Sequence, residues 1–200
     1  MDKAKDTENK IKKFYIADVH FGHNNILFFD KRPWHDLAHM ERDMISAWNT
    51  KVRECDEVYI LGDLILGNAD EWRRIVPNLH GKKFLITGNH DLRQIPGDVC
   101  RMFVKVSPYY ETHDGIYHIV MSHYPMIAYE HDVHSGVLML YGHVHNTEEF
   151  KVLKKAVAVY KEQCEKKMYP YQGNLFNCWC GFYDYAPATL EEILSNKNNH

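Results

Sequence analysis

The amino-acid sequence contains neither a long hydrophobic run nor an excess of basic charge. No apolar stretch in its 200 residues approaches the ~20 residues that a membrane-spanning helix needs, so no membrane partner is expected. The formal net charge is −3 at pH 7. Without a dominant basic field, tight electrostatic binding to long nucleic acid is not expected either.

Cysteine is scarce and no secretory signal is visible. The first residues, MDKAKDTENKIKK, are charged and contain no apolar core of the kind that a signal peptide carries. The cysteine count of five is odd, which indicates reduced thiols, and we expect a cytoplasmic protein. Cys178 and Cys180 lie in an apolar stretch without a second Cys or His pair nearby, so we interpret them as buried thiols rather than metal ligands.

Short apolar runs alternate with helical patterns early in the chain and cluster later. The runs occupy 13–20, 57–63, 83–91, 101–111, 116–125, 136–145 and 175–182, and the helical patterns occupy 37–52, 68–79, 148–168 and 187–194. Asp114-Gly115 suits a tight turn, Thr147 an N-cap, and Thr189 with Glu192 a capping box. This order predicts an α/β fold that begins parallel and later contains an antiparallel hairpin. Residues 1–12 are predicted to be a flexible lead-in and 13–196 a single domain.

Metal-competent side chains stand at the ends of five apolar runs. They are Asp18 with His20, Asp63, Asn89 with His90, His123, and His143 with His145. Residues two apart on extended backbone point the same way, which would aim both imidazoles of YGHVHN in one direction. Because the ends of neighbouring strands line one crevice in open α/β sheets, we expect these side chains to meet at one site.

The residue types indicate two metal ions. Leaving out His90, seven candidate ligands mix imidazole nitrogen with carboxylate and amide oxygen, and none is a thiolate. Seven are too many for one catalytic ion that keeps an open position, but they suit two ions that share a carboxylate about 3.5–4 Å apart. Mixed N and O ligands favour Mn, Fe, Zn, Co or Ni over Ca or Mg, and manganese is our first expectation.

Five motifs occur in a fixed order: DVH at 18–20, GD at 62–63, GNHD at 88–91, SHYP at 122–125 and GHVH at 142–145. In these motifs the chain resembles the calcineurin-like metallophosphoesterase superfamily, and PATLEEI resembles the tail of its small bacterial-type members. The resemblance implies a four-layer sandwich, in which two mixed β-sheets pack face to face and are flanked by helices.

The resemblance also implies roles for the matching residues. The first ion would be held by Asp18, His20 and His145, the second by Asn89, His123 and His143, and Asp63 would bridge the two. A metal-bridging hydroxide would attack phosphorus, and His90 would stabilise the transition state or protonate the leaving oxygen. The implied activity is hydrolysis of a small phosphodiester. The alternatives are a phosphomonoesterase of the same fold or a non-catalytic metal-binding scaffold subunit.

Three further residues have open roles. His23 lies one short turn after His20 and could contact substrate, while Arg32 could fork onto a phosphate or form a surface salt bridge. Asp91 could orient an imidazole or cap a helix. The run GDLILG lacks the Asp and Arg that protein phosphatases of the superfamily carry after GD, which argues against protein dephosphorylation. The natural substrate and the oligomeric state stay open.

Overall fold

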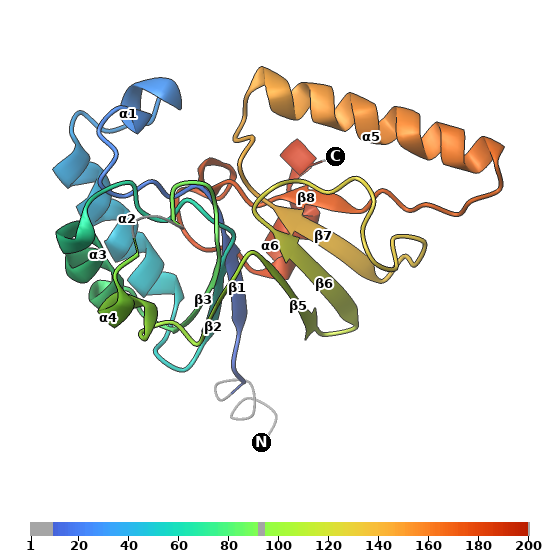
Figure 1. Ribbon diagram of the computed structural model, residues 1–200. Helices are drawn as coiled ribbons and strands as arrows, with labels where there is room; N and C mark the ends of the chain where they lie inside the picture. The colour runs from blue at the N-terminus through green and yellow to red at the C-terminus, as the bar shows by residue number, and fades with distance from the viewer. Residues whose placement is uncertain (1–9, 92–94, 200) are drawn as a thin grey trace, which may run out of the picture.

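A computed structural model describes residues 10–91 and 95–199 and contains two four-stranded β-sheets flanked by helices (Figure 1). The strands are β1 (Lys13–Ile16), β2 (Glu57–Ile60), β3 (Lys82–Ile86), β4 (Lys105–Ser107), β5 (Tyr109–Asp114), β6 (Tyr117–Ser122), β7 (Val137–Tyr141) and β8 (Leu175–Asn177). The α-helices are α1 (Ile26–Phe29), α2 (Leu37–Lys51), α3 (Ala69–Ile75), α4 (Gly97–Cys100), α5 (Glu148–Lys166) and α6 (Leu190–Ser195). Short 3-10 helices are η1 (Val76–Asn78), η2 (Cys180–Phe182) and η3 (Lys197–Asn199). The predicted α/β class is confirmed. Residues 1–9 of the predicted lead-in, 1–12, lie outside the described residues.

The two sheets differ in strand direction. The first sheet has the order β1-β2-β3-β4 with parallel pairing throughout, so the expectation of a mixed sheet is wrong for this half. The second has the order β5-β6-β7-β8, with β5 antiparallel to β6 and the other pairs parallel. The predicted turn at Asp114-Gly115 joins β5 to β6, and Gly115 takes the positive φ of 60° that such a turn needs.

Strand side chains alternate between two buried layers. Along β1, Phe14 and Ile16 contact a core that includes Trp48 of α2, whereas Tyr15 between them belongs to a core shared with the second sheet. This shared core contains side chains from β1 to β3 and from β6 to β8, so the sheets pack face to face. Strands covered on both faces read as continuous apolar runs, which explains the sequence pattern.

One predicted strand is broken into two. The run 101–111 was expected to be a single strand, but β4 ends at Ser107 and β5 begins at Tyr109 in the other sheet. Pro108 stands between them, and because proline has no N–H to donate, it ends the pairing of β4 at the point where the chain changes sheet.

The end of the chain also differs from the prediction. The last strand, expected over 175–182, stops at Asn177 and leads into η2. Cys178 and Cys180 are fully buried, as predicted, and burial raises the pKa of the Cys180 thiol to about 12. The capping box of Thr189 with Glu192 at the start of α6 is confirmed.

The long helix α5 lies over the outer face of the second sheet (Figure 1). Phe150 is its only buried residue, and Leu153 and Val157 are partly buried beside it. Thr147 precedes the helix but makes no side-chain cap; its hydroxyl donates to the carbonyl of Val144 at 2.8 Å instead. Among the described residues, no helix is both long enough and apolar enough to cross a bilayer.

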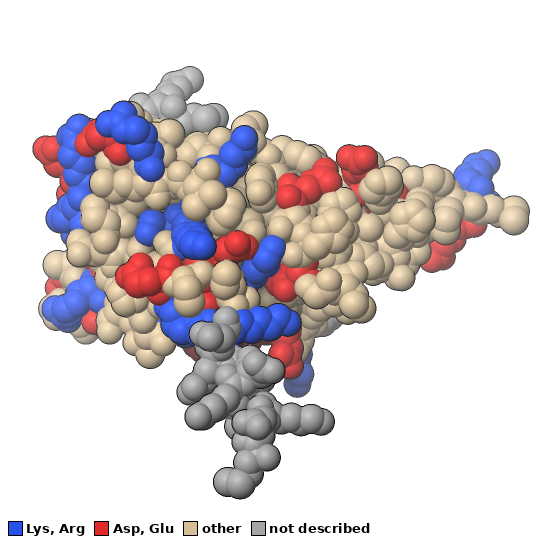
Figure 2. Space-filling view, turned by 90° about the horizontal axis from the view of Figure 1, so that it is seen from below, with Lys and Arg blue, Asp and Glu red and all other residues tan. Residues whose placement is uncertain are grey.

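The surface seen from below, opposite the carboxyl ends of β1 to β3, mixes charges of both signs. Figure 2 shows scattered Lys and Arg side chains next to Asp and Glu side chains at the left and centre of this face, with uncharged residues over much of the rest. Such alternation agrees with the small net charge of −3.

A buried carboxylate ties the entry of β1 to the turn before β2. Asp56 is fully buried and accepts hydrogen bonds from the backbone N–H of Lys12 at 2.9 Å and of Arg53 at 3.0 Å. The Arg53 guanidinium adds bonds of 2.7 and 3.0 Å. Burial raises the pKa of Asp56, but these donors outweigh it and hold the pKa at about 2.

We therefore predict that Asp56→Asn lowers the free energy of unfolding by about 1–2 kcal/mol at neutral pH, a figure reduced for solvent screening at Arg53. Because the folded-state pKa is lowered from 3.8 to about 2, this stability is present above the unfolded pKa and is lost as pH falls between those values. Urea unfolding of both proteins at pH 7 and pH 3 measures it. The exposed Glu54→Gln is the control. If Asp56→Asn lowered the free energy of unfolding by the same amount at pH 7 and at pH 3, the lowered pKa of Asp56 would not be the cause.

Candidate metal centre

The carboxyl ends of five strands place the candidate ligands. Asp18 and His20 follow β1, Asp63 follows β2, Asn89 and His90 follow β3, His123 follows β6, and His143 and His145 follow β7. In Figure 1 these strand ends meet at the upper side of the molecule, between the two sheets. The predicted residues therefore come from both sheets and lie together.

The first cluster consists of Asp18, His20 and His145. One ligand atom from each lies within 4.8 Å of the others. The Nε2 atoms of His20 and His145 are 3.3 Å apart, and Nε2 of His145 lies 3.7 Å from Oδ1 of Asp18. Two imidazoles and a carboxylate converging in this way form a three-ligand set that a transition-metal ion accepts.

The second cluster consists of Asp63, His123 and His143, whose ligand atoms also lie within 4.8 Å of one another. Nε2 of His123 is 3.6 Å from Oδ2 of Asp63. Asn89 joins this cluster, since its Oδ1 lies 3.1 Å from the same nitrogen. His123 is fixed by its other ring nitrogen, which donates to the carbonyl of Leu61 at 2.8 Å.

A single oxygen atom of Asp63 faces both clusters. Its Oδ2 lies 3.6 Å from Nε2 of His123 and 3.9 Å from Nε2 of His20. Its Oδ1 is held away by the backbone N–H of His90 at 3.1 Å. This is the arrangement that a carboxylate shared by two ions requires.

His90 stands beside the clusters but belongs to neither of them. Its Nε2 lies 3.8 Å from Oδ2 of Asp63, and its ring centroid is 5.7 Å from that of His20. The side chain is 37% exposed, whereas that of Asp63 is 3% exposed. His90 therefore has the access to solvent and substrate that a proton donor needs.

The backbone of the site is not extended, contrary to the argument from the sequence. Five candidate ligands have positive φ between 45° and 71°: Asp18, His20, Asp63, His143 and His145. This left-handed conformation costs non-glycine residues free energy and is concentrated at functional sites. His143 and His145 also do not act as one pair, because each belongs to a different cluster.

Two glycines let the loops approach one another. Gly62 has φ of 86°, and a Cβ atom there would overlap the ring of His123. At Gly142 a Cβ would lie 2.6 Å from Cβ of Ala17 and 2.8 Å from Oδ2 of Asp18. The glycines of the GD and GHVH motifs are thus needed because the ligand loops pack in direct contact.

In the described part of the chain, Asp91 takes neither of the roles considered for it. It is fully buried and accepts hydrogen bonds from the backbone N–H groups of Asp63 and Gly88, each at 2.8 Å, and of Leu64 at 3.1 Å. It therefore fixes the two ligand loops after β2 and β3 to each other. Burial raises the pKa of Asp91 to about 6, although the backbone donors act in the opposite direction.

Arg32 is placed differently from either prediction. It is 5% exposed, and its guanidinium donates to the carbonyls of Val19 at 2.7 Å and Asp18 at 2.9 Å. It also pairs with Asp30 at 3.0 Å. The surface salt bridge is wrong, because Arg32 is buried. The donors of its guanidinium are used within the protein, which leaves the predicted contact with a phosphate without support.

Asp30 is a residue that the sequence analysis missed. Its Oδ1 accepts from Nδ1 of His145 at 2.7 Å, and its Oδ2 pairs with Arg32. A carboxylate in this position fixes the tautomer and orientation of a metal-binding imidazole. The sequence gives no periodic signal for it, since Asp30 stands in a loop 115 residues from its partner.

His23 lies at the edge of the first cluster. Its ring centroid is 5.4 Å from that of His20 and 6.1 Å from that of Phe29. Its Nδ1 is buried and has no hydrogen-bond partner in the described part of the chain. A contact between His23 and substrate therefore stays a prediction.

The protonation of the site suits cation binding. Burial raises the pKa of Asp18 to about 7, and the neighbouring Asp63 and Asp30 act in the same direction against His145. Burial lowers the pKa of His20 and of His123, so both imidazoles are neutral at pH 7 and their close approach to Asp63 is not an ion pair. Neutral imidazoles beside carboxylates that repel one another form a site that a divalent cation stabilises.

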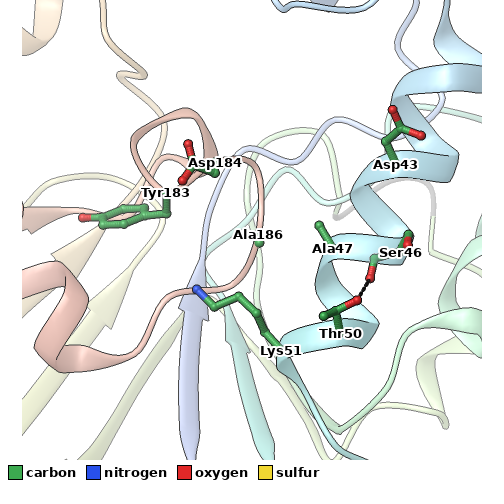
Figure 3. Close-up of a pocket in the computed structure, with 8 residues that line it drawn as sticks. All are labelled: Asp43, Ser46, Ala47, Thr50, Lys51, Tyr183, Asp184 and Ala186. Atoms are coloured by element: carbon green, nitrogen blue, oxygen red, sulfur yellow. Dashed lines mark hydrogen bonds between the residues drawn. The ribbon is translucent and has the colours of Figure 1, made fainter.

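A separate hollow of about 500 Å³ lies between α2 and the loop 183–186 (Figure 3). Its lining includes Asp43, Lys51 and Asp184, and it contains none of the candidate ligands. This hollow is therefore separate from the candidate metal centre, where the ligand loops pack in direct contact.

Comparisons with known proteins give relatives without an assigned activity. No protein-family profile matches the chain. The chain is 42% identical over 82 residues to the uncharacterized protein MJ1445 of Methanocaldococcus jannaschii, a match that covers 40% of this chain and 47% of that protein. The chain thus spans about half the length of this relative. It is 26% identical over 164 residues to the Gene 66 protein of Mycobacterium phage L5, covering 66% of this chain and 77% of that one.

A solved structure has the same fold. The protein of unknown function AQ665 from Aquifex aeolicus superposes with a TM-score of 0.63 over 92% of this chain and 98% of its own, at 24% sequence identity. At this identity the likeness shows the fold alone.

The position of Asp30 gives a prediction about metal affinity. Asp30→Asn removes the charge behind His145, so we expect binding of one of two manganese ions to weaken by about 10–100-fold while the second is kept. Calorimetric titration of metal-free protein with Mn²⁺ measures both affinities. Asp132→Asn, a buried carboxylate bonded to Tyr169 at 2.9 Å, is the control. Unchanged binding of both ions in Asp30→Asn would exclude this role.

Proposed function

We propose that the chain is a dinuclear-metal-dependent phosphoester hydrolase of the calcineurin-like metallophosphoesterase type, acting on a small phosphodiester. The observation that carries the proposal is the pair of His and Asp clusters joined at Oδ2 of Asp63. Two-metal sites occur in phosphatases, nucleases and aminopeptidases, and among these classes the resemblance of the ligand motifs favours enzymes that hydrolyse phosphate esters. Manganese is the first candidate metal.

The residues present fit two such ions. Asp18, His20 and His145 would hold one ion. The other would be held by Asn89, His123 and His143, with Asp63 shared between them. Asn89 contributes an oxygen without charge, which leaves the loaded site positive and attractive to a phosphate anion. Bound there, the ions would activate a water molecule and polarise the phosphoryl oxygens.

Among the protein side chains, His90 would act as the proton donor, and the loop after β3 positions it. The backbone N–H of His90 bonds to Asp63, so the imidazole keeps a fixed place beside the shared oxygen. From there Nε2 can donate a proton to the leaving oxygen of the ester. Asp91 holds the same loop by its bond to Gly88, which keeps the donor in position.

The placement of Arg32 supports a diester over a monoester. A phosphomonoester carries about two negative charges at pH 7, and enzymes commonly meet them with an arginine. Among the described residues, Arg32 is the arginine in contact with the backbone of the first cluster, and its guanidinium is directed to Asp30 and to backbone carbonyls rather than outward. A diester, with one negative charge, makes no such demand.

We predict that His90→Ala loses most turnover of bis(p-nitrophenyl) phosphate, by about 10²–10⁴-fold, since a positioned proton donor contributes that much. The metal content should be nearly unchanged, because His90 is in neither cluster. Release of p-nitrophenolate with added Mn²⁺ and metal analysis of the same samples measure both, with the exposed His113→Ala as control. Equal turnover in His90→Ala would remove its role, and bound metal without turnover of any ester in the wild type would favour a scaffold.

Metal binding should weaken as pH falls below 7. The pKa of Asp18 is raised to about 7, and that of His145 is raised because Asp30 and Asp18 outweigh burial, so both groups carry protons in the acidic range. A metal ion must displace these protons, which reduces its apparent affinity at pH 6 relative to pH 8. Calorimetry at both values, in buffers of different ionisation enthalpy, gives the affinity and the protons released. Equal affinity without proton release would contradict the prediction.

A further inference from the structure

The short helix α1 exposes two phenylalanines beside the metal centre. Phe28 is 82% exposed and Phe29 is 65% exposed, whereas Ile26 of the same helix is buried in the core. Single exposed apolar residues are ordinary, but adjacent exposed aromatics at the rim of a polar site are typical of a ligand surface. Packing of α1 is already provided by Ile26 and Leu27, so it does not explain the phenylalanines.

Ring contacts lead from this helix into the centre. Phe29 lies 6.1 Å from His23, and His23 lies 5.4 Å from His20 of the first cluster, between ring centroids. Phe28 lies 6.2 Å from Phe29 and extends the aromatic surface outward. The rim next to the first cluster is therefore aromatic.

Phe28 and Phe29 form an aromatic platform, which hydrogen bonds hold beside the candidate metal centre. Asp30, which follows Phe29 directly, donates its backbone N–H to Ile26 at 3.0 Å and accepts from His145 at 2.7 Å. Arg32 donates its backbone N–H to Leu27 at 2.9 Å. Phe29 and the ligand His145 are thus positioned by the same carboxylate residue, which fixes the distance between them.

We propose that Phe29, with Phe28 beside it, binds the planar ring of the substrate and that the substrate is a nucleoside phosphodiester. This inference rests on the proposed function, which places the phosphate at the metal centre. Phe29 lies one ring beyond His23 from the first cluster, and we infer that a ring carried on a sugar suits this separation better than a ring bonded directly to the ester oxygen. Phenylalanine stacks on any base because every base has a π-face.

Binding of phosphate monoesters to the manganese-loaded protein tests the platform without turnover. Adenosine monophosphate should bind on the order of ten-fold more tightly than glycerol phosphate, because stacking adds affinity for one and not the other. Phe29→Ala should lose most of this difference with glycerol phosphate unchanged, and Phe29→Trp should keep it. Ile116→Ala, at an 88% exposed apolar residue of the β5–β6 turn, is the control.

The outcomes separate the two proposals. The platform would be excluded if the wild type bound adenosine monophosphate and glycerol phosphate equally, or if the ratio of these two affinities were unchanged in Phe29→Ala. Phenyl phosphate binding as tightly as the nucleotide, with the same dependence on Phe29, would overturn the nucleoside assignment. Hydrolysis of bis(p-nitrophenyl) phosphate is measured on the same preparations. If this hydrolysis were absent while the preference for adenosine monophosphate over glycerol phosphate remained, the proposed hydrolase activity would be wrong and the platform would be retained.

Discussion

Buried carboxylates are the constraint on which this structure depends. Asp18, Asp63 and Asp91 are at most 3% exposed, and burial together with the neighbouring charge of Asp63 raises the pKa of Asp18 and of Asp91. Burying an ionised carboxylate is costly unless it is paired, so each must be met by donors or by a cation. Asp91 is met by three backbone N–H groups, and Asp63 and Asp18 receive those of His90 and His143. Oδ2 of Asp63 faces His20 and His123, whose pKa values burial lowers, so a divalent cation would find its charge uncompensated there.

Backbone strain at the same loops has the same origin. Left-handed φ at five candidate ligands costs of order 1 kcal/mol or more for each. The loops keep this conformation because Arg32 holds the carbonyls of Asp18 and Val19, and Asp91 holds the N–H groups of the facing loops. Such strain occurs at the ligands that follow β1, β2 and β7, and it helps to bring their side chains to within a few ångströms of one another. The stability of the surrounding sheets is thus used to keep a site in a conformation that the loops alone would not adopt.

The sequence analysis found the candidate ligands but did not find the backbone geometry that brings them together. The candidate ligands could be found because short apolar runs mark strands and a polar residue after each run is conspicuous. The argument from extended backbone failed for His143 and His145, because the left-handed turns after β7 send them to different clusters. Asp30 and Arg32 could not be assigned, since their roles depend on contacts across the fold that no local pattern records. The break at Pro108 was readable in principle, because proline cannot continue a ladder, but the apolar residues on both sides concealed it.

The division of ligands between the sheets has a mechanical consequence. The first cluster takes Asp18 and His20 from one sheet and His145 from the other, and the second joins Asp63 to His123 and His143 in the same way. Ions held by these groups would cross-link the two sheets at the edge of their shared core. Since a ligand that binds only the folded state stabilises it, metal binding would strengthen the packing between sheets that already positions the ligands. The fold and the site would then support each other, because the core aligns the strand ends and the ions hold those ends together.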